Sequence, residues 1–485
     1  MRIAVIGGGI AGLSAAWTLE KARRQGADIE YCVFERATRL GGVIQTEKLD
    51  DGSLLEAGPD SFLTEKPWAA DLCRELGLGN DLVGSNDAVR KTWIVLHGRL
   101  TPLPDGLQFL VPTRIRPIVT SSLFSAGTKA RFAREYLFPP RPLAADQDES
   151  VTQFVARHFG QELVERLAEP LLAGIYGGSA GELSVRAVLP RMAKMEAEHR
   201  SLIRGVLHAR RTQLPAASAP NPLFTTLGGG MQQMTDALAA QLDSACIRLQ
   251  TEVRSLRPAR GAWDVTVAGV VQSFDSIIVA LPARAAAALL AEADAELAAQ
   301  LAAIRYTSSV TVNLGYDRRV LSGADQSRLA GFGFLVPRSE RRRLLACTYT
   351  HNKFLHRASP QRAIFRCFFA AEKADQIMAL PDDQIAALAA AELRDILQLP
   401  ASPELTRVAR WPHAMAQYTV GHLERVTEIE RLCQNLPGLA LAGNAFRGIG
   451  VPDCVRSGTQ AAEQLLRAKA ALAHRAEHTA PSRVQ

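Results

Sequence analysis

Three glycines at the spacing G-x-G-x-x-G follow a short apolar run at the start of the chain, and this feature constrains the fold most. The run Arg2–Ile6 is rich in β-branched residues and predicts a buried strand. The segment 12–21 has the apolar spacing of a helix. In such a unit Gly7 permits a tight turn, Gly9 lets the backbone approach a pyrophosphate, and Gly12 allows close helix–strand packing. The N–H groups at the start of the helix would then face phosphates.

A glutamate after the next predicted strand distinguishes a dinucleotide site from an ordinary tight turn. The segment Ile29–Phe34 has the pattern of a second strand, and Glu35 follows it, 23 positions after Gly12. This is close to the ~20 residues expected for a carboxylate that binds ribose hydroxyls. An acidic residue here argues against the 2′-phosphate of NADP. The sequence therefore predicts a site for a dinucleotide without that phosphate.

The composition narrows the class of protein. The chain has 485 residues, 47% of them hydrophobic and 22% charged, which is enough for two or three soluble domains. It has no run of ~18 uncharged apolar residues, so we expect no transmembrane helix. The seven cysteines form no C-x-x-C pair, which predicts a cytoplasmic setting with neither a zinc site nor a redox dithiol. The net charge of +7 comes without a nucleic-acid motif, so we expect no nucleic-acid partner.

The expected elements divide the chain into segments of three kinds. Some segments alternate strands with helices, one has short alternating strands typical of an antiparallel sheet, and one combines a proline-rich stretch with helical patterns. The expected domains are a dinucleotide-binding domain at 1–85, 222–304 and 405–470, a sheet domain at 86–99 and 305–404, a helical domain at 100–221, and a polar tail at 471–485.

Several later motifs resemble one branch of the flavin amine oxidases and their relatives. From Glu35 the sequence continues ERATRLGGVIQTE, whose Gly-Gly resembles the second glycine signature of these enzymes. Five further motifs resemble the oxygen-dependent protoporphyrinogen and coproporphyrinogen III oxidases: GPDSFL at 58–63, SLIRG at 201–205, LGGGMQQM at 227–234, GFGFLVP at 331–337 and GIGVPDCVRSG at 448–458. The resemblance extends from residue 1 to about residue 466.

The resemblance implies a mixed α/β (α+β) fold like that of p-hydroxybenzoate hydroxylase. A Rossmann-like FAD-binding domain would be joined by a substrate domain with an antiparallel sheet and by a helical insertion. The implied cofactor is FAD. The residues implied to bind it are Gly7, Gly8, Gly9, Ile10, Ala11 and Gly12 at the pyrophosphate, Glu35 and Arg36 at the ribose, Gly42 and Val43, Gly58, Pro59, Asp60 and Ser61 beneath the flavin ring, Val253 at the adenine, Trp411 beside the flavin, and Ile449, Gly450 and Val451 in the C-terminal loop.

The resemblance also implies a wall for a flat macrocyclic substrate. The corresponding positions are Phe332, Gly333, Leu335, Thr348 and Phe368. Core-facing residues of a sheet would show the same pattern, so both interpretations stay open here. Where animal members carry an arginine that pairs with a propionate, this chain has Thr92, with Lys91 adjacent. We therefore expect Lys91 or another base to take that role.

The implied reaction is the six-electron oxidation of protoporphyrinogen IX or coproporphyrinogen III to the porphyrin, in haem biosynthesis. FAD would accept a hydride from a meso carbon in each of three rounds and pass the electrons to O₂, which gives H₂O₂. No side chain is predicted as a catalytic acid or base, and no metal is predicted. The resemblance further implies peripheral contact of segment 100–221 with the inner face of the membrane, and handover of the product to a ferrochelatase.

Two alternatives stay open from the sequence. The first is another flavin oxidoreductase of the same superfamily, such as an amine oxidase or a carotenoid desaturase. In that case Cys454, in the C-terminal loop region, is the candidate for a covalent link to FAD. The second is a flavin-binding porphyrin carrier without catalytic activity. The choice between the two porphyrinogens and the oligomeric state are also open.

Overall fold

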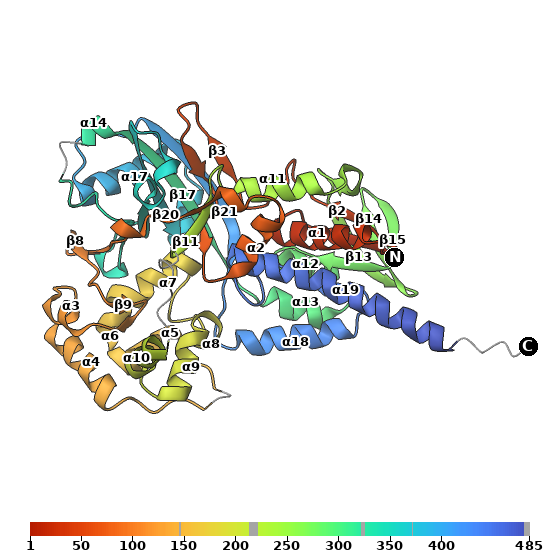
Figure 1. Cartoon of the computed structure of the whole chain (residues 1–485), viewed down its shortest axis with the longest axis horizontal. Coiled ribbons are helices and arrows are strands. Elements are labelled where there is room, and N and C mark those ends of the chain that lie inside the picture. The colour runs from red at the N-terminus through yellow and green to blue at the C-terminus, as the bar shows by residue number, and fades with distance from the viewer. Residues whose placement is uncertain (145–146, 213–221, 322–324, 371, 480–485) are drawn as a thin grey trace, which may run out of the picture.

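A five-stranded parallel sheet forms the centre of one lobe of the molecule (Figure 1). The computed structural model describes residues 1–144, 147–212, 222–321, 325–370 and 372–479. The strands lie in the order β12 (Ile247–Arg248), β2 (Glu30–Phe34), β1 (Arg2–Ile6), β16 (Ser276–Val279) and β22 (Leu439–Leu441). Parallel strands covered on both faces need apolar residues at every position. This explains the unbroken apolar run in β1.

Alternation along β1 assigns its side chains to two separate cores. Ile3 and Val5 pack under a helical layer, whereas Ala4 and Ile6 point to the other face. The helical layer contains α1 (Ile10–Arg24), α2 (Pro67–Glu75), α11 (Gln232–Gln241) and α19 (Val451–Thr479). The other face carries the antiparallel strands β13 (Val253–Ala259), β14 (Ala262–Val267) and β15 (Val270–Phe274), with α12 (Ala283–Leu290), α13 (Ala295–Ala302) and α18 (His422–Gln434).

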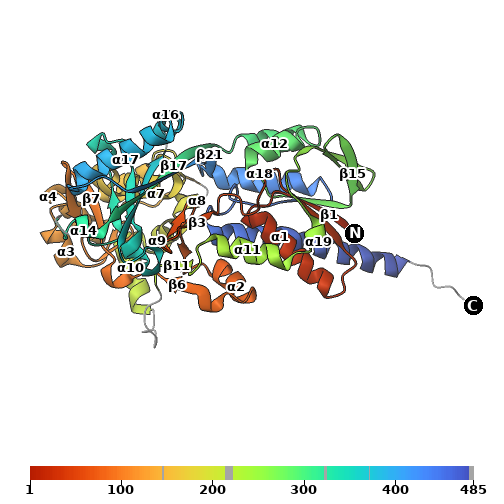
Figure 2. The same cartoon turned by 90° about the horizontal axis from the view of Figure 1, so that it is seen from above.

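A seven-stranded, mostly antiparallel sheet forms the second lobe, beside the first (Figure 2). Its order is β21 (Leu405–Ala416), β17 (Tyr306–Asp317), β20 (Arg362–Ala370), β19 (Ala346–Tyr349), β18 (Gly333–Leu335), β7 (Thr92–Leu96) and β8 (Arg99–Pro102). One face packs against α16 (Glu372–Met378) and α17 (Asp382–Leu397). The opposite face is turned toward a helical region, and Ile94 and Leu335 on that face pack against its core.

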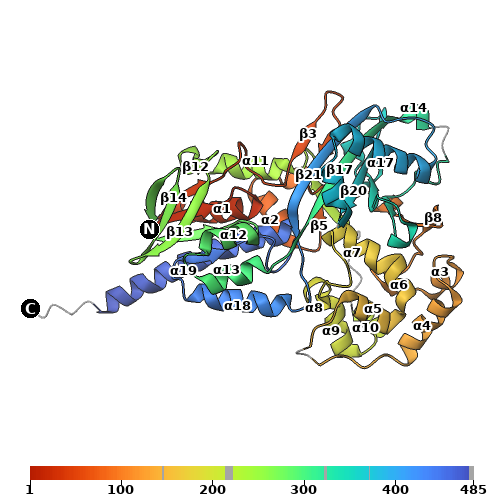
Figure 3. The same cartoon turned by 180° about the vertical axis from the view of Figure 1, so that it is seen from behind.

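A helical region with its own apolar core lies at the end of this second lobe (Figure 3). It contains the hairpin β9 (Leu107–Gln108) and β10 (Val111–Pro112) and the helices α3 (Ile115–Thr120), α4 (Ala126–Leu137), α5 (Val151–Phe159), α6 (Gln161–Leu163), α7 (Glu169–Tyr176), α8 (Val185–Val188), α9 (Pro190–His199) and α10 (Leu202–Thr212), with a π-helical turn at Val164–Ala168. Within the described residues, no helix is long and apolar enough to span a bilayer.

Short elements connect the larger units. Two small sheets lie in segments that follow the first strands of the parallel sheet or lead back to it. They are the hairpin of β3 (Thr46–Lys48) and β4 (Leu54–Glu56), and the three-stranded sheet of β5 (Phe62–Leu63), β11 (Phe224–Leu227) and β6 (Leu82–Gly84). The short helices α14 (Arg318–Leu321) and α15 (Thr350–Lys353) follow strands of the large sheet.

Three observed boundaries differ from the expected domains. The expected return to the dinucleotide domain at 405 does not occur, because β21 pairs with β17 and adds a twelve-residue edge strand to the large sheet. On the other side of that sheet β8 continues to Pro102, past the expected end at 99. The helix α19 continues to Thr479, where a polar tail was expected, because its last turns are rich in alanine. Residues 480–485 of that tail lie outside the described residues.

Candidate functional site

The turn between β1 and α1 shows two different uses of glycine. A Cβ on Gly12 would lie 1.8 Å from the carbonyl oxygen of Gly7, so only glycine fits where α1 crosses the strand. A Cβ on Gly9 would meet nothing within 4 Å, so the space above this residue is open. Gly9 gives α1 no side-chain cap, and the first turn has no acidic residue. The positive end of α1 is therefore suited to an anion.

Glu35 lies against this turn, at the end of β2. One carboxylate oxygen accepts a hydrogen bond from the amide of Gly8 at 2.7 Å, and the other accepts one from the amide of Ala37 at 2.8 Å. The amide of Gly41 donates to the carbonyl of Gly8 at 2.8 Å. The two glycine loops and the acidic strand end predicted from the sequence therefore form one continuous surface.

Gly42 and Val43 follow on the exposed side of that surface. Val43 is apolar and 42% exposed. A Cβ on Gly58 would lie 1.8 Å from the carbonyl oxygen of Val43, so the loop Gly58–Ser61 passes directly against it. These two predicted segments are thus brought together.

The loop before Gly58 is attached to the large sheet by its backbone. The carbonyl oxygen of Ala57 accepts hydrogen bonds from the indole of Trp411 and the hydroxyl of Thr311, both at 2.8 Å. The guanidinium of Arg366 donates to the carbonyl of Gly58. Trp411 is a residue of β21, so the sheet lobe, and not the Rossmann lobe, contributes this aromatic ring.

A buried ionic cluster lies under the same loop. The ammonium of Lys353 contacts both carboxylate oxygens of Asp60 at 3.1 Å and the hydroxyl of Ser61 at 2.9 Å. Arg366 lies 3.9 Å from the same carboxylate. Burial alone would raise the pKa of Asp60, but the charges of Lys353 and Arg366 lower it well below its usual range. Burial lowers the pKa of Lys353 and of Arg366.

A second buried pair continues this cluster. The guanidinium of Arg357 is fully buried and pairs with Glu56. Glu56 also accepts hydrogen bonds from the amide of Met231 at 2.7 Å and the hydroxyl of Thr46 at 2.7 Å. We call the five charged residues the loop cluster: Glu56, Asp60, Lys353, Arg357 and Arg366.

Most of the expected substrate wall lies on the sheet face turned away from α17. Strand register places Thr92 beside Gly333, Gly333 beside Thr348, and Thr348 beside Arg366. The next row along contains Leu335 and Phe368. Alternate residues such as Phe334, Cys347 and Cys367 form the core with α17 instead. Five of the expected residues therefore share one face: Thr92, Gly333, Leu335, Thr348 and Phe368.

Lys91 does not join this row. Its ammonium lies 3.9 Å from the centre of the Trp93 ring, and Trp93 belongs to the core on the opposite face. The structure therefore does not place Lys91 where a propionate-binding base was expected. Phe332 is buried and directly precedes β18.

The C-terminal loop completes the arrangement. Ile449 and Leu335 both pack against the core of the helical region, so this loop and the sheet face meet at one boundary. The helix α19 begins at Val451, and the Asp453 carboxylate in its first turn accepts a hydrogen bond from the amide of Gly450 at 3.3 Å. Asp453 is paired with Lys66 at 2.6 Å and Arg456 at 3.4 Å.

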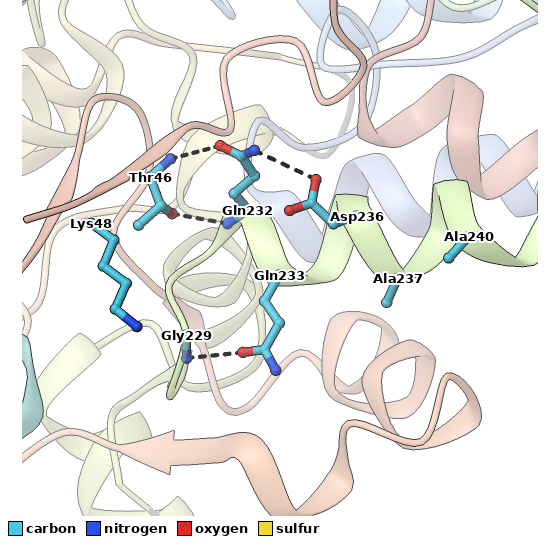
Figure 4. A pocket seen from close by; sticks show the side chains of 8 residues that line it. All are labelled: Thr46, Lys48, Gly229, Gln232, Gln233, Asp236, Ala237 and Ala240. Carbon is cyan, nitrogen blue, oxygen red and sulfur yellow. Dashed lines mark hydrogen bonds between the residues drawn. The ribbon is translucent and has the colours of Figure 1, made fainter. Parts of the chain in front are cut away.

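Two cavities adjoin these segments. One, of about 350 Å³, is lined by Arg39, Gln45, Glu47, Leu55, Ala57, Asn313, Arg407, Val408, Ala409, Arg410 and Trp411, and so reaches the Trp411–Ala57 contact. The other, of about 460 Å³, is lined by Thr46, Lys48, Gly229, Gln232, Gln233, Asp236, Ala237 and Ala240. Figure 4 shows Thr46 and Gln232 joined there by two hydrogen bonds, which tie β3 to the start of α11. No residue predicted to bind cofactor or substrate lines this second cavity.

Comparison with known proteins identifies the family of the chain. The profile of the family described as flavin containing amine oxidoreductase matches residues 10–466. The chain belongs to the flavin-containing amine oxidoreductase family. Coproporphyrinogen III oxidase of Bacillus subtilis (strain 168) is 35% identical over 471 residues, which cover 96% of this chain and 97% of the relative. The chloroplastic protoporphyrinogen oxidase of Nicotiana tabacum is 29% identical, with 95% and 84% covered.

Two solved structures have a similar fold. A crystal structure from Exiguobacterium sp. 255-15, assigned to a protoporphyrinogen oxidase, has a TM-score of 0.83 and 28% identity, with 96% of this chain and 98% of that chain covered. Cyclohexylamine oxidase from Brevibacterium oxydans IH-35A has a TM-score of 0.68 at 17% identity, with 96% and 99% covered. The predicted mixed fold is thereby confirmed.

FAD is the cofactor of this flavin-dependent oxidoreductase, and the surface described above fits it. The open space over Gly9 and the uncapped end of α1 suit a pyrophosphate. Glu35 suits ribose hydroxyls, and the exposed Val43 suits an apolar ring system. When bound, FAD supplies two-electron oxidation chemistry, and the protein supplies binding, orientation and charge. The individual roles of the predicted residues stay predictions.

The loop cluster is the part of the site that sequence reasoning missed. Asp60 was predicted as a cofactor-binding residue of the loop beneath the flavin ring, but without its ionic partners, and Lys353, Arg357 and Arg366 were not predicted at all. Arg366 had a usable signal, since it is the one charged residue in the apolar run 363–369 of a strand. Lys353 and Arg357 had none, because only the tertiary fold brings α15 and the turn after it under residues 56–61.

Proposed function

We propose that this enzyme oxidises a porphyrinogen to the corresponding porphyrin, with coproporphyrinogen III as the preferred substrate. The observation that supports it most is the identity of 35% along almost the whole length of an enzyme named for that substrate. Two further relatives with that name, from Propionibacterium freudenreichii and Staphylococcus aureus, are 31% and 28% identical over at least 96% of this chain.

The sheet face supports a flat, mostly apolar substrate. Leu335 and Phe368 are half-buried on this face, and Leu335 and Ile449 pack against the helical core that contains α7. Such walls exclude water and hold a macrocycle in one orientation beside the loop Gly58–Ser61. The pyrrole nitrogens of the substrate can release their own protons, so no side-chain base is required. The protein's task is then orientation and exclusion of water.

A comparison of substrates under anaerobic conditions tests this proposal. The purified holoenzyme is mixed with coproporphyrinogen III, protoporphyrinogen IX or a primary amine, and the flavin absorbance is followed. We expect rapid bleaching with coproporphyrinogen III, slower bleaching with protoporphyrinogen IX and none with the amine. Porphyrin fluorescence should appear as each porphyrinogen is consumed.

Each alternative function predicts a different result in the same experiment. A flavin that stays yellow with both porphyrinogens would contradict oxidase activity and favour a porphyrin carrier. Bleaching by the amine alone would favour an amine oxidase. We propose O₂ as the acceptor, which readmission of air tests by formation of H₂O₂. Handover to a ferrochelatase and the oligomeric state stay predictions from the resemblance.

We also propose that the helical region contacts a membrane surface. On α3 and at the end of α4, four apolar side chains are exposed: Ile115 at 83%, Val119 at 57%, Leu137 at 57% and Phe138 at 74%. Exposed arginines flank them: Arg114, Arg116, Arg131 and Arg134. Figures 1 and 3 show both helices at the end of the molecule farthest from the Rossmann lobe. Apolar residues among cations suit an anionic bilayer surface.

Sedimentation with lipid vesicles tests the membrane contact. We expect the protein to pellet with vesicles that contain phosphatidylglycerol and to stay in solution with phosphatidylcholine alone. The variant Ile115→Ser with Phe138→Ser should lose about tenfold in vesicle affinity, because two exposed apolar side chains no longer insert. The double variant Val270→Ser with Val271→Ser, on the exposed β15, is the matched control and should bind as the wild type does. Equal binding by all three proteins would contradict this proposal.

A further inference from the structure

The loop cluster contains more positive than negative charge. Lys353, Arg357 and Arg366 supply three cations, whereas Glu56 and Asp60 supply two carboxylates, so the cluster has a net charge of +1. The side chains of Arg357 and Arg366 are 0% and 5% exposed. A buried excess charge is costly unless something opposite in charge comes near it.

Arg366 is the member of the cluster without a close ionic partner. Arg357 contacts Glu56 directly and Lys353 contacts Asp60 at 3.1 Å, but Arg366 comes no closer than 3.9 Å to the Asp60 carboxylate. Its Nε has no hydrogen-bond partner within the described part of the chain. The excess charge is therefore located at Arg366.

Arg366 also lies close to the segment that carries the cofactor surface. Its guanidinium donates to the carbonyl of Gly58, the first residue of the loop expected beneath the flavin ring. It lies 4.9 Å from the centre of the Phe368 ring, on the sheet face of the expected substrate wall. Residues from both lobes bury it there, and little water remains to screen its charge.

A further positive element near the site, the start of α19, is partly neutralised. The first turn of α19 lies near the segment that follows the Gly58–Ser61 loop, because Lys66 pairs with Asp453. The Asp453 carboxylate also accepts a hydrogen bond from the amide of Gly450. The cations that pair with Asp453, Lys66 and Arg456, are 35% and 28% exposed and are better screened by solvent. The charge on Arg366 is therefore the least compensated of the buried charges beside the loop.

We propose that Arg366 is an electrostatic positioning residue that stabilises the negative charge which FAD acquires when it is reduced. The reduced anion compensates the excess charge of the loop cluster, so Arg366 favours electron transfer from the substrate to the cofactor. This inference rests on the flavin chemistry of the proposed function and not on the identity of the porphyrinogen. Arg366 acts through the field at the Gly58 loop.

Sulfite is a suitable probe, because it adds to flavin N5 and leaves a negative charge on the pyrimidine part of the ring, without any substrate. We expect Arg366→Met to weaken sulfite binding about tenfold and to lower the two-electron midpoint potential of the flavin by about 30 mV. For a two-electron couple, about 30 mV corresponds to the same tenfold change in an equilibrium constant. Arg366→Lys retains the charge, so its sulfite affinity should stay within about threefold of that of the wild type.

Arg407→Met is the matched control. Arg407 lies on the same sheet face, since Asn313 pairs with Arg366 on one side and with Arg407 on the other. It is 48% exposed and bound to Glu47 at 2.9 Å, so its charge is screened. We expect its removal to leave sulfite affinity and potential unchanged.

A substitution that raises the net charge of the loop cluster, where Arg366→Met lowers it, tests the proposal even if Arg366→Met does not retain FAD. Asp60→Asn raises the net charge of the loop cluster to +2, so it should strengthen sulfite binding several-fold. The proposal is overturned if Arg366→Met binds sulfite as the wild type does, if Arg366→Lys is as weak as Arg366→Met, or if Asp60→Asn does not strengthen binding. If the wild type does not oxidise porphyrinogens but the sulfite results are as expected, the proposed substrate is contradicted and the role of Arg366 is not.

Discussion

The carboxylate of Glu35 and the backbone amide of Gly8 are joined by a hydrogen bond of 2.7 Å, although the two residues belong to different strand–loop units. The end of β2 is thereby fixed against the glycine turn after β1, although Gly8 and Glu35 are 27 positions apart in the sequence. A ribose bound at Glu35 and a pyrophosphate bound at the turn would be held at a set spacing.

Substitution of Glu35 should reduce FAD affinity without unfolding the protein. Glu35→Ala removes a charged acceptor of two hydrogen bonds, so we expect FAD binding to weaken at least about tenfold, or ~1.4 kcal/mol. Titration of the apoprotein with FAD, followed by flavin fluorescence, measures this loss. Glu30→Ala on the same strand removes a carboxylate that is 80% exposed and should leave FAD affinity unchanged. Equal affinity of the Glu35→Ala variant and the wild type would contradict the ribose role.

Two glycines of the first turn should respond differently to the same added methyl group. Gly9→Ala places a Cβ in open space, so the apoprotein should keep its thermal stability while FAD binding is lost. Gly12→Ala places a Cβ 1.8 Å from the Gly7 carbonyl oxygen, so we expect a loss of about 3 kcal/mol or more in stability. Thermal unfolding of both apoproteins and FAD titration separate these effects. The interpretation would be wrong if Gly9→Ala bound FAD normally.

The contrast between these two glycines shows why the Rossmann half could be predicted from the sequence. Its chemistry lies in contiguous residues, because the strand, the turn and the helix start are neighbours in the chain. The loop cluster is different, since Asp60 and Lys353 are 293 positions apart and only the fold brings them together. No local pattern indicates such a pair.

Two other differences have physical causes that a local pattern does not contain. Lys91 and Thr92 are adjacent in sequence, but Lys91 lies just before β7 with its ammonium over the Trp93 ring, whereas Thr92 pairs with Gly333 in the row on the opposite face. The strand β21 contains polar and charged residues at many positions, because an edge strand is partly exposed. The domains expected from the sequence place it with the segment that follows it, and not with the sheet it completes.

The stability of the helical region should fall as the pH rises above neutral. His158 is fully buried between Glu135 at 3.1 Å and Glu196 at 2.9 Å. Burial lowers the pKa of His158, but the two carboxylates raise it above its usual value. The pKa of His158 is therefore higher in the folded protein than in the unfolded chain. The contribution of protonated His158 to the free energy of unfolding is then fully present below pH 6.5, its pKa in the unfolded chain. This contribution is lost as the pH rises through the pKa of His158 in the folded protein.

The variant His158→Gln isolates the contribution of His158 to stability. We expect the wild-type Tm to fall by about 2 °C or more between pH 6.5 and pH 9 relative to His158→Gln, which cannot titrate there. The histidines His351 and His422 have pKa values lowered to about 4, because burial disfavours their charged forms. They change stability only on the acid side and do not affect this comparison. Parallel curves for the two proteins would show that His158 does not titrate in this window.

The flavin should be released when the protein is denatured with acid, because Cys454 is poorly suited to a covalent link. The Cys454 side chain is buried in the first turn of α19, within the core shared with α1. Burial raises the pKa of the Cys454 thiol to about 12, so almost no nucleophilic thiolate forms near neutral pH. Trichloroacetic acid should therefore leave a colourless pellet and a yellow supernatant, both for the wild type and for Cys454→Ser. A yellow pellet that becomes colourless only in Cys454→Ser would demonstrate the covalent bond and favour the amine oxidase alternative.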